Sequence, residues 1–356
     1  MNRPHLDFGL ALHRALPAGT NVVWSPYSVA SALGLAAVGA RGRTRGELAA
    51  ALAPGGELAA LSRMLVTSAE VGDAEAAIAN TLWTRQGLEF QAAYLDEVTQ
   101  WPGGAVRTAD FAGDPEAARL TINEDVARTT RGLIRDLLAA GAVSTATAAV
   151  IVNALYLRVA WRHAFPAEAT APATFHAPAG PRQVPMMRQR ERLGYAAVVG
   201  WRMVTLPTAA DLMVDLLLAD GPAGAAPDRE TLTALYGASR SRLVDLALPR
   251  FRVEFATTLN APLARLGVVA AFSREADFTG ITDRERIMID RVVHKAVLRV
   301  DEQGFEGAAA TALLMRTVSM EVGSPVTFHC DRPFCVIVRH ARTGAVFFVA
   351  RVMDPA

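Results

Sequence analysis

The sequence predicts an α+β fold built around large mixed β-sheets, and three observations support this. Apolar residues at helical spacing and alanine-rich runs fill much of residues 6–138. From residue 148 onward, short apolar runs bounded by turn residues are typical of strands. The two kinds of element do not alternate in the regular strand–helix rhythm of a parallel α/β sheet.

A single domain is expected over residues 1–356, although the length alone would suggest about two. The Gly/Pro-rich stretches at 53–57, 178–181 and 221–227 are short, which suits surface loops better than linkers. The hydrophobic share is 51%, enough for a large core. A compact chain of this size removes roughly three quarters of its unfolded surface from water.

End signals place several helices in the first half. Ser25 is a predicted N-cap with Pro26 in the first turn, and the Ala/Leu-rich run 29–38 continues that helix. Thr44 and Glu47 have capping-box spacing and predict a short helix to residue 52. The remaining predictions here are a helix at 6–16, a strand at 76–84 and a long amphipathic helix at 116–138.

Strand patterns dominate the second half. Residues 148–160 are apolar almost throughout, as in a central strand buried on both faces. Further strands are predicted at 203–205, 212–218, 246–256, 287–300, 326–330, 335–339 and 345–352, with helices at 231–236 and 259–266.

Charge and composition argue against several classes of partner. The formal net charge is +1, so no overall field favours nucleic acid or a membrane surface. No run of about 18 uncharged apolar residues predicts a membrane span. Lys295 is the only lysine, a sign of GC-rich coding bias. The first residues lack the apolar run of a signal peptide, which leaves two compartments open: cytoplasmic as the chain stands, or extracellular if a leader was removed.

Signatures of catalysis and metal binding are missing. The sequence has no G-x-S-x-G, H-E-x-x-H, Walker or G-x-G-x-x-G motif, and its seven histidines lack metal-ligand spacing. We therefore expect no enzyme, no metal and no cofactor, although a hydrolase with a dispersed triad stays open because triads need no local motif.

For the two cysteines and for two basic clusters, an ordinary structural interpretation fits better than a functional one. Cys330 and Cys335 are five apart, which on a strand places them on opposite faces, so free buried thiols are expected. Two basic clusters suit a solvated face better than an anion or polysaccharide site; they are Arg41, Arg43 and Arg45, and Arg188, Arg190 and Arg192.

The segment 300–320 (VDEQGFEGAAATALLMRTVSM) has the most unusual composition in the chain. Residues 307–312 carry only small side chains, which would let the segment slide between two existing strands with little steric hindrance. At period two, Glu306 and Arg316 share one face, so an inserted strand would bury the other face, which begins with Phe305. An alanine-rich helix is the alternative, and the segment alone does not decide between them.

Nine short motifs, in order over most of the chain, resemble the serpin family. Each is weak alone, but together they are a strong signal. They are 25–33 (SPYSVASAL), 39–44 (GARGRT), 80–83 (NTLW), 122–134 (IN, V and TRGLI), 152–165 (VNALYL, then W and F), 277–281 (DFTGI), 294–297 (HKAV), 331–334 (DRPF) and 351–355 (RVMDP).

The resemblance implies a serpin fold of about nine helices and three β-sheets, with a five-stranded central sheet and an exposed reactive loop at about 302–325. It implies a prokaryotic, monomeric inhibitor of a serine protease that acts as a suicide substrate. The protease serine attacks a loop carbonyl, the cut loop inserts into the central sheet, and the distorted protease cannot hydrolyse the acyl ester. About a dozen new ladder hydrogen bonds at roughly 1 kcal/mol each would supply on the order of 10 kcal/mol. The native state would then be held kinetically.

Residues of the loop match positions of the family's reactive-loop motif. Glu302 and Gly304 match the loop base, and the hinge matches Phe305, Glu306, Gly307, Ala308, Ala309, Ala310 and Thr311. The family register places the attacked carbonyl at Val318, followed by Ser319. A small β-branched residue there suits an elastase-like protease or a tolerant subtilisin-like one, and the expected target is an elastase-, chymotrypsin- or subtilisin-like protease. Because the segment 318–331 looks longer than in many relatives, Thr317, Met320 and Arg316 stay open as the reactive residue, and Arg316 would redirect the inhibitor to trypsin-like enzymes.

Six residues outside the loop also match family positions. Ser25, Ser28, Asn153 and His294 match the polar cluster that governs strand opening, Trp161 matches the aromatic at the insertion point, and Arg250 matches the partner of Glu302.

Phe305 departs from the Thr or Ser of inhibitory members. Seating a large ring during insertion would overpack the site at about 1–3 kcal/mol. The alternative function is therefore a non-inhibitory serpin, a carrier or binding protein whose loop is cut without trapping.

Overall fold

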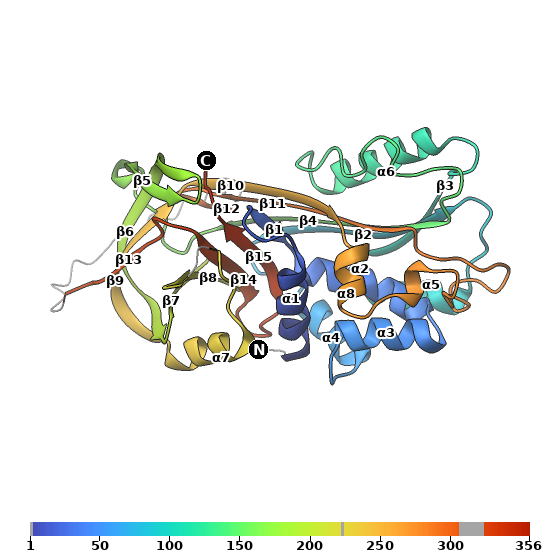
Figure 1. Ribbon diagram of the computed structural model, residues 1–356, viewed down its shortest axis with the longest axis horizontal. Helices are drawn as coiled ribbons and strands as arrows, with labels where there is room; N and C mark the ends of the chain where they lie inside the picture. The colour runs from blue at the N-terminus through green and yellow to red at the C-terminus, as the bar shows by residue number, and fades with distance from the viewer. Residues whose placement is uncertain (1–2, 222–223, 306–323) are drawn as a thin grey trace.

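The computed structural model describes residues 3–221, 224–305 and 324–356 (Figure 1). Its α-helices are α1 (Arg3–Ala15), α2 (Pro26–Gly39), α3 (Gly42–Leu52), α4 (Leu58–Thr67), α5 (Ala92–Val98), α6 (Pro115–Thr129), α7 (Arg229–Ala238) and α8 (Asn260–Arg265). Its strands are β1 (Val22–Trp24), β2 (Glu75–Arg85), β3 (Gly104–Ala109), β4 (Ala149–Ala160), β5 (Ala171–Ala177), β6 (Gly180–Val198), β7 (Trp201–Pro207), β8 (Leu212–Ala219), β9 (Arg240–Pro249), β10 (Phe251–Thr258), β11 (Arg291–Val300), β12 (Gly304–Phe305), β13 (Val326–His329), β14 (Phe334–His340) and β15 (Val346–Val352). The expected α+β class is confirmed.

The counts of elements differ from the expectation. The described residues form eight α-helices rather than about nine, together with 3-10 turns at Ala167–Ala169 and Ala270–Phe272. Hydrogen bonds join their strands into two sheets rather than three, of six and nine strands. The reason is β6, which is 19 residues long and pairs in succession with β5, β9 and β7.

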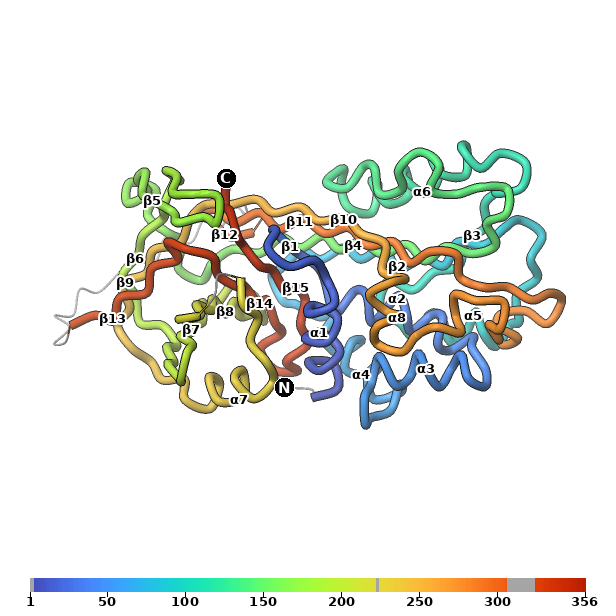
Figure 2. Tube along the Cα trace, in the orientation of Figure 1, coloured from blue at the N-terminus to red at the C-terminus, as the bar shows by residue number. Residues whose placement is uncertain are grey.

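The six-stranded sheet has the order β10-β11-β12-β4-β2-β3, and its long strands run along the long axis of the molecule (Figure 2). Five of these strands have 6 to 12 residues, which matches the five expected for the central sheet, and the sixth, β12, has two residues. The central pair, β4 and β11, is parallel and pairs directly from Val150↔Arg291 to Leu155↔Ala296.

The predicted double burial of β4 is confirmed, because every residue of the strand except Arg158 is buried. Val150 and Val152 belong to a cluster with α6, which covers one face of the sheet in Figure 1. Ile151 and Leu155 belong to the main core on the opposite face, where α2 contacts β4. The alternation follows from the period-two geometry of a strand.

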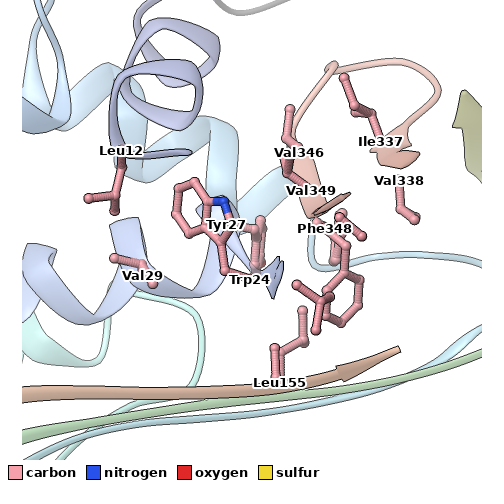
Figure 3. Close-up of a cluster of buried hydrophobic side chains, with 14 of the residues drawn as sticks. Leu12, Trp24, Tyr27, Val29, Leu155, Ile337, Val338, Val346, Phe348 and Val349 are labelled. Atoms are coloured by element: carbon pink, nitrogen blue, oxygen red, sulfur yellow. The ribbon is translucent and has the colours of Figure 1, made fainter. Parts of the chain in front are cut away.

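The main core fills the space between the two sheets and the first two helices. Figure 3 shows side chains from α1, β1, α2, β4, β14 and β15 converging there. Tyr27 of α2 stacks on Phe347 of β15 with ring centroids 4.4 Å apart, and the Tyr27 hydroxyl donates to the Leu65 carbonyl. Helix α2 is therefore buried almost completely, which matches its continuous Ala/Leu sequence.

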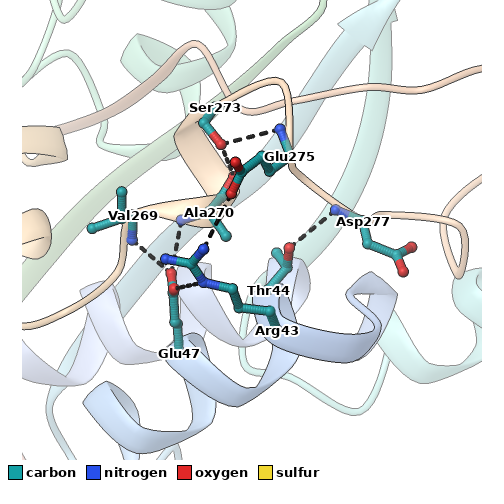
Figure 4. A network of polar contacts seen from close by, with 8 residues as sticks. All are labelled: Arg43, Thr44, Glu47, Val269, Ala270, Ser273, Glu275 and Asp277. Carbon is teal, nitrogen blue, oxygen red and sulfur yellow. Dashed lines mark hydrogen bonds and ion pairs between the residues drawn. The ribbon is translucent and has the colours of Figure 1, made fainter.

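Ser25 caps α2 as predicted, since its Oγ accepts a hydrogen bond from the Ser28 amide at 3.0 Å. The capping box predicted from Thr44 and Glu47 is wrong. Helix α3 begins at Gly42, and both side chains reach a distant segment instead (Figure 4). Thr44 Oγ1 accepts from the Asp277 amide, and Glu47 Oε2 accepts from the amides of Val269 and Ala270.

Two other predicted boundaries are wrong. The helix expected at 116–138 ends at Thr129, because Arg131 and Gly132 adopt positive φ angles of 52° and 78° that stop a right-handed helix. The strand expected at 246–256 is two strands in different sheets, β9 and β10, which are separated by Arg250.

Cys330 and Cys335 are free and buried, as expected. Among the described residues, none of the helices combines the length and the apolar character needed to traverse a bilayer.

Candidate functional site

The two residues of β12 occupy the gap between the central parallel strands. Phe305 pairs with Val300 of β11 and with Val159 of β4, and Gly304 pairs with Ala160. The chain that leads toward the expected loop thus enters the central sheet between β4 and β11. Beyond this point the two strands close on each other over six paired positions, Val150–Leu155 against Arg291–Ala296.

A tight turn before β12 is anchored on Trp161. The Trp161 indole Nε1 donates to the Asp301 carbonyl at 2.9 Å, and its backbone amide donates to the Gln303 carbonyl at 3.0 Å. The Asp301 carboxylate accepts from the Gln303 amide, which closes the turn. Trp161 therefore fixes the backbone at the base of the expected loop through two main-chain contacts.

Glu302 is held by charge as well. Arg250 Nη2 lies 2.5 Å from Glu302 Oε1, and Thr170 Oγ1 donates to the same oxygen at 2.7 Å. Burial alone would raise the pKa of Glu302, but the hydrogen bonds from Arg250 and Thr170 outweigh it and hold the pKa below its ordinary value. Glu302 thus stays ionised and links β12 to the segments that carry Thr170 and Arg250.

Gly304 is required by close backbone packing. Its φ is +148°, and a Cβ atom built on it would lie 2.1 Å from the Val159 carbonyl oxygen and 2.8 Å from Ala160 Cα. Because both contacts are with backbone, no side-chain rotation relieves them. Only glycine fits between these strands.

Phe305 is already seated in the core. Its side chain is 1% exposed, and its ring lies 5.1 Å from the Trp161 ring, which in turn meets Phe165 edge-on at 6.0 Å. We expected this ring to find a cavity only during insertion, whereas in the structure it is already buried against Trp161. Such aromatic contacts add about 0.5–1.5 kcal/mol beyond area burial.

A row of three polar side chains crosses the part of the sheet in which β4 and β11 pair directly. His294 of β11, Asn153 of β4 and Asn80 of β2 occupy paired positions on adjacent strands, and all three are fully buried. His294 Nδ1 lies 2.5 Å from Asn153 Oδ1, and Asn153 Nδ2 lies 2.5 Å from Asn80 Oδ1. Any separation of β4 from β11 must break the His294–Asn153 contact.

Helix α2 completes this network. Ser28 Oγ donates to Asn80 Oδ1 and accepts from Asn153 Nδ2, while the Ser25 amide donates to His294 Nε2. Since Nε2 accepts and Asn153 Oδ1 can only accept, His294 is the neutral tautomer with its proton on Nδ1. Burial lowers the pKa of His294 to about 3, which agrees with a neutral ring.

The network leads to a prediction for acid stability. Burial lowers the pKa of His294 and His13 to about 3 and that of His5 to about 4. In the unfolded chain all three would bind protons below about pH 6.5, so stability falls as pH drops through the range from about 6.5 to 3. At pH 5 each histidine should reduce the free energy of unfolding by about 2 kcal/mol relative to pH 7.5.

Denaturant unfolding at pH 7.5 and pH 5, followed by tryptophan fluorescence, measures this loss. His294→Gln should remove about a third of the pH-dependent part, whereas the exposed His176→Gln should leave it unchanged. An unaltered pH dependence in His294→Gln would contradict the assignment.

The sequence motifs did not identify Asn80 as a member of this cluster, although Asn80 begins the motif 80–83 (NTLW). A carboxamide in a buried strand was the available signal, since such a group needs a partner. What the sequence alone could not supply was the strand register that aligns Asn80 with Asn153.

The remaining site predictions lie outside the described residues. They are the hinge residues Glu306, Gly307, Ala308, Ala309, Ala310 and Thr311, and the reactive bond Val318–Ser319. The extent of the reactive loop, the single-domain organisation and the roles of the site residues stay predictions.

Comparison with known proteins decides the family. The family model described as "Serpin (serine protease inhibitor)" matches residues 4–355. This chain belongs to the serpin family. The serpin is 34% identical to the leukocyte elastase inhibitor of Sus scrofa, over 98% of this chain and 97% of that protein.

Two further relatives agree. The serpin is 33% identical to an uncharacterized serpin-like protein of Thermococcus kodakarensis, over 98% of this chain and 84% of that protein. Among solved structures, uncleaved ovalbumin superposes with a TM-score of 0.87 at 26% identity, with 99% of both chains covered. The serpin fold expected from the sequence is thereby confirmed.

Proposed function

We propose that this serpin inhibits an elastase-, chymotrypsin- or subtilisin-like serine protease as a suicide substrate. The observation that carries the proposal is the position of β12, which already occupies the gap between β4 and β11 at the end from which a cut loop would enter. The likeness to a leukocyte elastase inhibitor supports the class of target. The proposed partner is the protease alone, bound to one serpin molecule.

The chemistry begins with the protease. Its serine Oγ attacks the Val318 carbonyl, the Val318–Ser319 bond breaks, and the amine of Ser319 leaves with the proton that the protease histidine took from the serine. Val318 is then an ester on the protease serine. Hydrolysis needs an intact oxyanion hole and triad, so any force that distorts them preserves the ester.

The serpin supplies that force by inserting the cut loop as a new strand. Insertion must separate six paired positions of β4 and β11, including His294 and Asn153, and it replaces each direct pairing with pairings on both sides. About a dozen new ladder hydrogen bonds at roughly 1 kcal/mol each supply on the order of 10 kcal/mol. Because Phe305 is already buried, the first apolar contact of the new strand is in place before cleavage.

The test is incubation with pancreatic elastase or subtilisin at equimolar ratio, followed by denaturing electrophoresis. We expect a covalent serpin–protease band that survives SDS, and a released C-terminal peptide that starts at Ser319. A control protease whose serine is blocked beforehand should give no such band. Clean cleavage without a covalent band would instead indicate a non-inhibitory serpin that acts as a carrier or binding protein.

A matched pair of loop variants separates trapping from cleavage. In the proposed inserted strand Thr311 lies on the face that begins with Phe305, whereas Ala310 lies on the face of Glu306. Thr311→Arg should abolish the covalent band and turn the serpin into a substrate, because a buried unpaired charge costs several kcal/mol. Ala310→Arg should keep the band.

A further inference from the structure

A cavity of about 570 Å³ lies on the nine-stranded sheet beside the C-terminal end of α7, and none of the described residues of the candidate site lines it. Five separate segments form it: the residues after β4, the strands β6 to β8, the end of α7, β14, and the turn between β14 and β15. Its size is within the range of small-molecule sites in proteins, about 300–1,000 Å³.

The charge of this cavity is one-sided. Four arginines line it, namely Arg162, Arg192, Arg339 and Arg342, and its described lining contains neither Asp nor Glu. Three carboxylates are neighbours in sequence of residues that line the cavity. Asp215, two residues from Met213, pairs with Arg339, and Glu191 precedes Arg192. Asp211 also lies two residues from Met213, and its backbone carbonyl accepts from the Ala341 amide. The arginines come from three separate places in the chain, so the fold, and not a local basic run, brings them together.

Arg339 forms a fixed floor. Its Nε lies 2.7 Å from Oδ2 of the fully buried Asp215, and Nη2 lies 3.3 Å from Oδ1. Tyr236 and Thr205 also donate to Asp215, at 2.7 and 2.6 Å, and the Tyr236 ring lies over the guanidinium at 4.7 Å. Burial alone would lower the pKa of Arg339, but Asp215 raises it well above its ordinary value. The Arg339 guanidinium therefore has a fixed position in the cavity, although Asp215 offsets its charge, so the uncompensated charge at the cavity comes from the exposed arginines.

The other lining groups define the ligand further. Arg162 and Arg342 are exposed at the rim, where their guanidinium groups can each take two oxygens of a phosphate or sulfate. Pro207, Met213 and the Tyr236 ring supply apolar wall, which an inorganic ion alone would not cover. We propose that this cavity binds a small organic polyanion that carries at least two phosphate or sulfate groups.

Isothermal titration of the intact protein with ATP and with sucrose octasulfate tests the proposal. One molecule of at least one probe should bind per chain and saturate. The double variant Arg162→Ala/Arg342→Ala should weaken binding by about a hundredfold, since each lost charge-assisted contact is worth about tenfold or more. Preference for ATP would identify phosphate as the natural group, and preference for the octasulfate would identify sulfate.

The matched control is Arg188→Ala/Arg190→Ala. It also removes two positive charges, but from exposed positions on β6 that do not line the cavity. Binding should therefore weaken less than about threefold. Equal losses in the two double variants would show a diffuse basic field and overturn the proposal, as would the absence of saturable binding of both probes. Thermal unfolding without ligand should be the same in both variants, which excludes misfolding as the cause.

Discussion

Replacing Asn153 with alanine is expected to lower the free energy of unfolding by roughly 2–4 kcal/mol. Asn153 is the central member of the row that crosses β11, β4 and β2, and its carboxamide contacts His294, Asn80 and Ser28. Without it, the buried His294 Nδ1–H loses its acceptor, and an unsatisfied buried group costs about 1–3 kcal/mol. The lost volume adds a cavity term of similar sign.

Denaturant unfolding and the unfolding rate measure this effect. The rate should rise, because the removed contacts join the two strands that must separate. Ser31→Ala is the control: Ser31 is equally buried on α2, but within the described part of the chain its Oγ bonds only to the Tyr27 carbonyl of the same helix. That variant should lose less than about 1 kcal/mol. Equal losses in the two variants would contradict a special role for the polar row.

Gly304→Ala is the second substitution with a large expected effect. The added methyl would clash with the Val159 carbonyl and Ala160 Cα, so β12 should leave the gap between β4 and β11. Phe305 would then lose its place against Trp161, and exposing a buried Phe side chain costs roughly 1.5–3 kcal/mol. The tryptophan emission should shift to longer wavelength as Trp161 becomes accessible to water.

Gly19→Ala is the matched control for this substitution. Gly19 also has a positive φ, +79°, but a Cβ there would meet no atom within 4 Å among the described residues. It therefore reports the backbone strain without the clash, about 1 kcal/mol. If both variants lose the same stability and neither shifts the emission, close packing of β12 is not what Gly304 provides.

The sequence predicted those parts of the fold in which local pattern and tertiary environment agree. The uninterrupted apolar run of β4 corresponds to a strand buried on both faces, and the Ser25-Pro26 signal corresponds to a real cap. Prediction failed where tertiary contacts use the same side chains differently. Thr44 and Glu47 have capping-box spacing, yet they bind amides at 269–277.

Strand β6 was not predicted at all, for a physical reason. Prolines at 181 and 185 argue against a strand, and its outward charges hide the buried positions Val184, Met186 and Leu193. In the site, Arg250 contacts Glu302 and His294 contacts Asn153, while the roles that the family motifs imply for these residues stay predictions. The sequence did not predict the burial of Phe305, because a strand of two residues is too short to show a periodic pattern.

The stability of the cleaved serpin tests the central claim most directly. The intact chain and a chain cut within residues 306–323 by a catalytic amount of a metalloprotease such as thermolysin, which has no serine nucleophile to trap, should be compared by guanidinium unfolding, with the cut located by mass. If the cut segment inserts between β4 and β11, the cleaved form should unfold at a much higher guanidinium concentration, with a gain on the order of 10 kcal/mol. An unchanged unfolding midpoint in the cleaved form would contradict insertion and, with it, the proposed inhibitory mechanism.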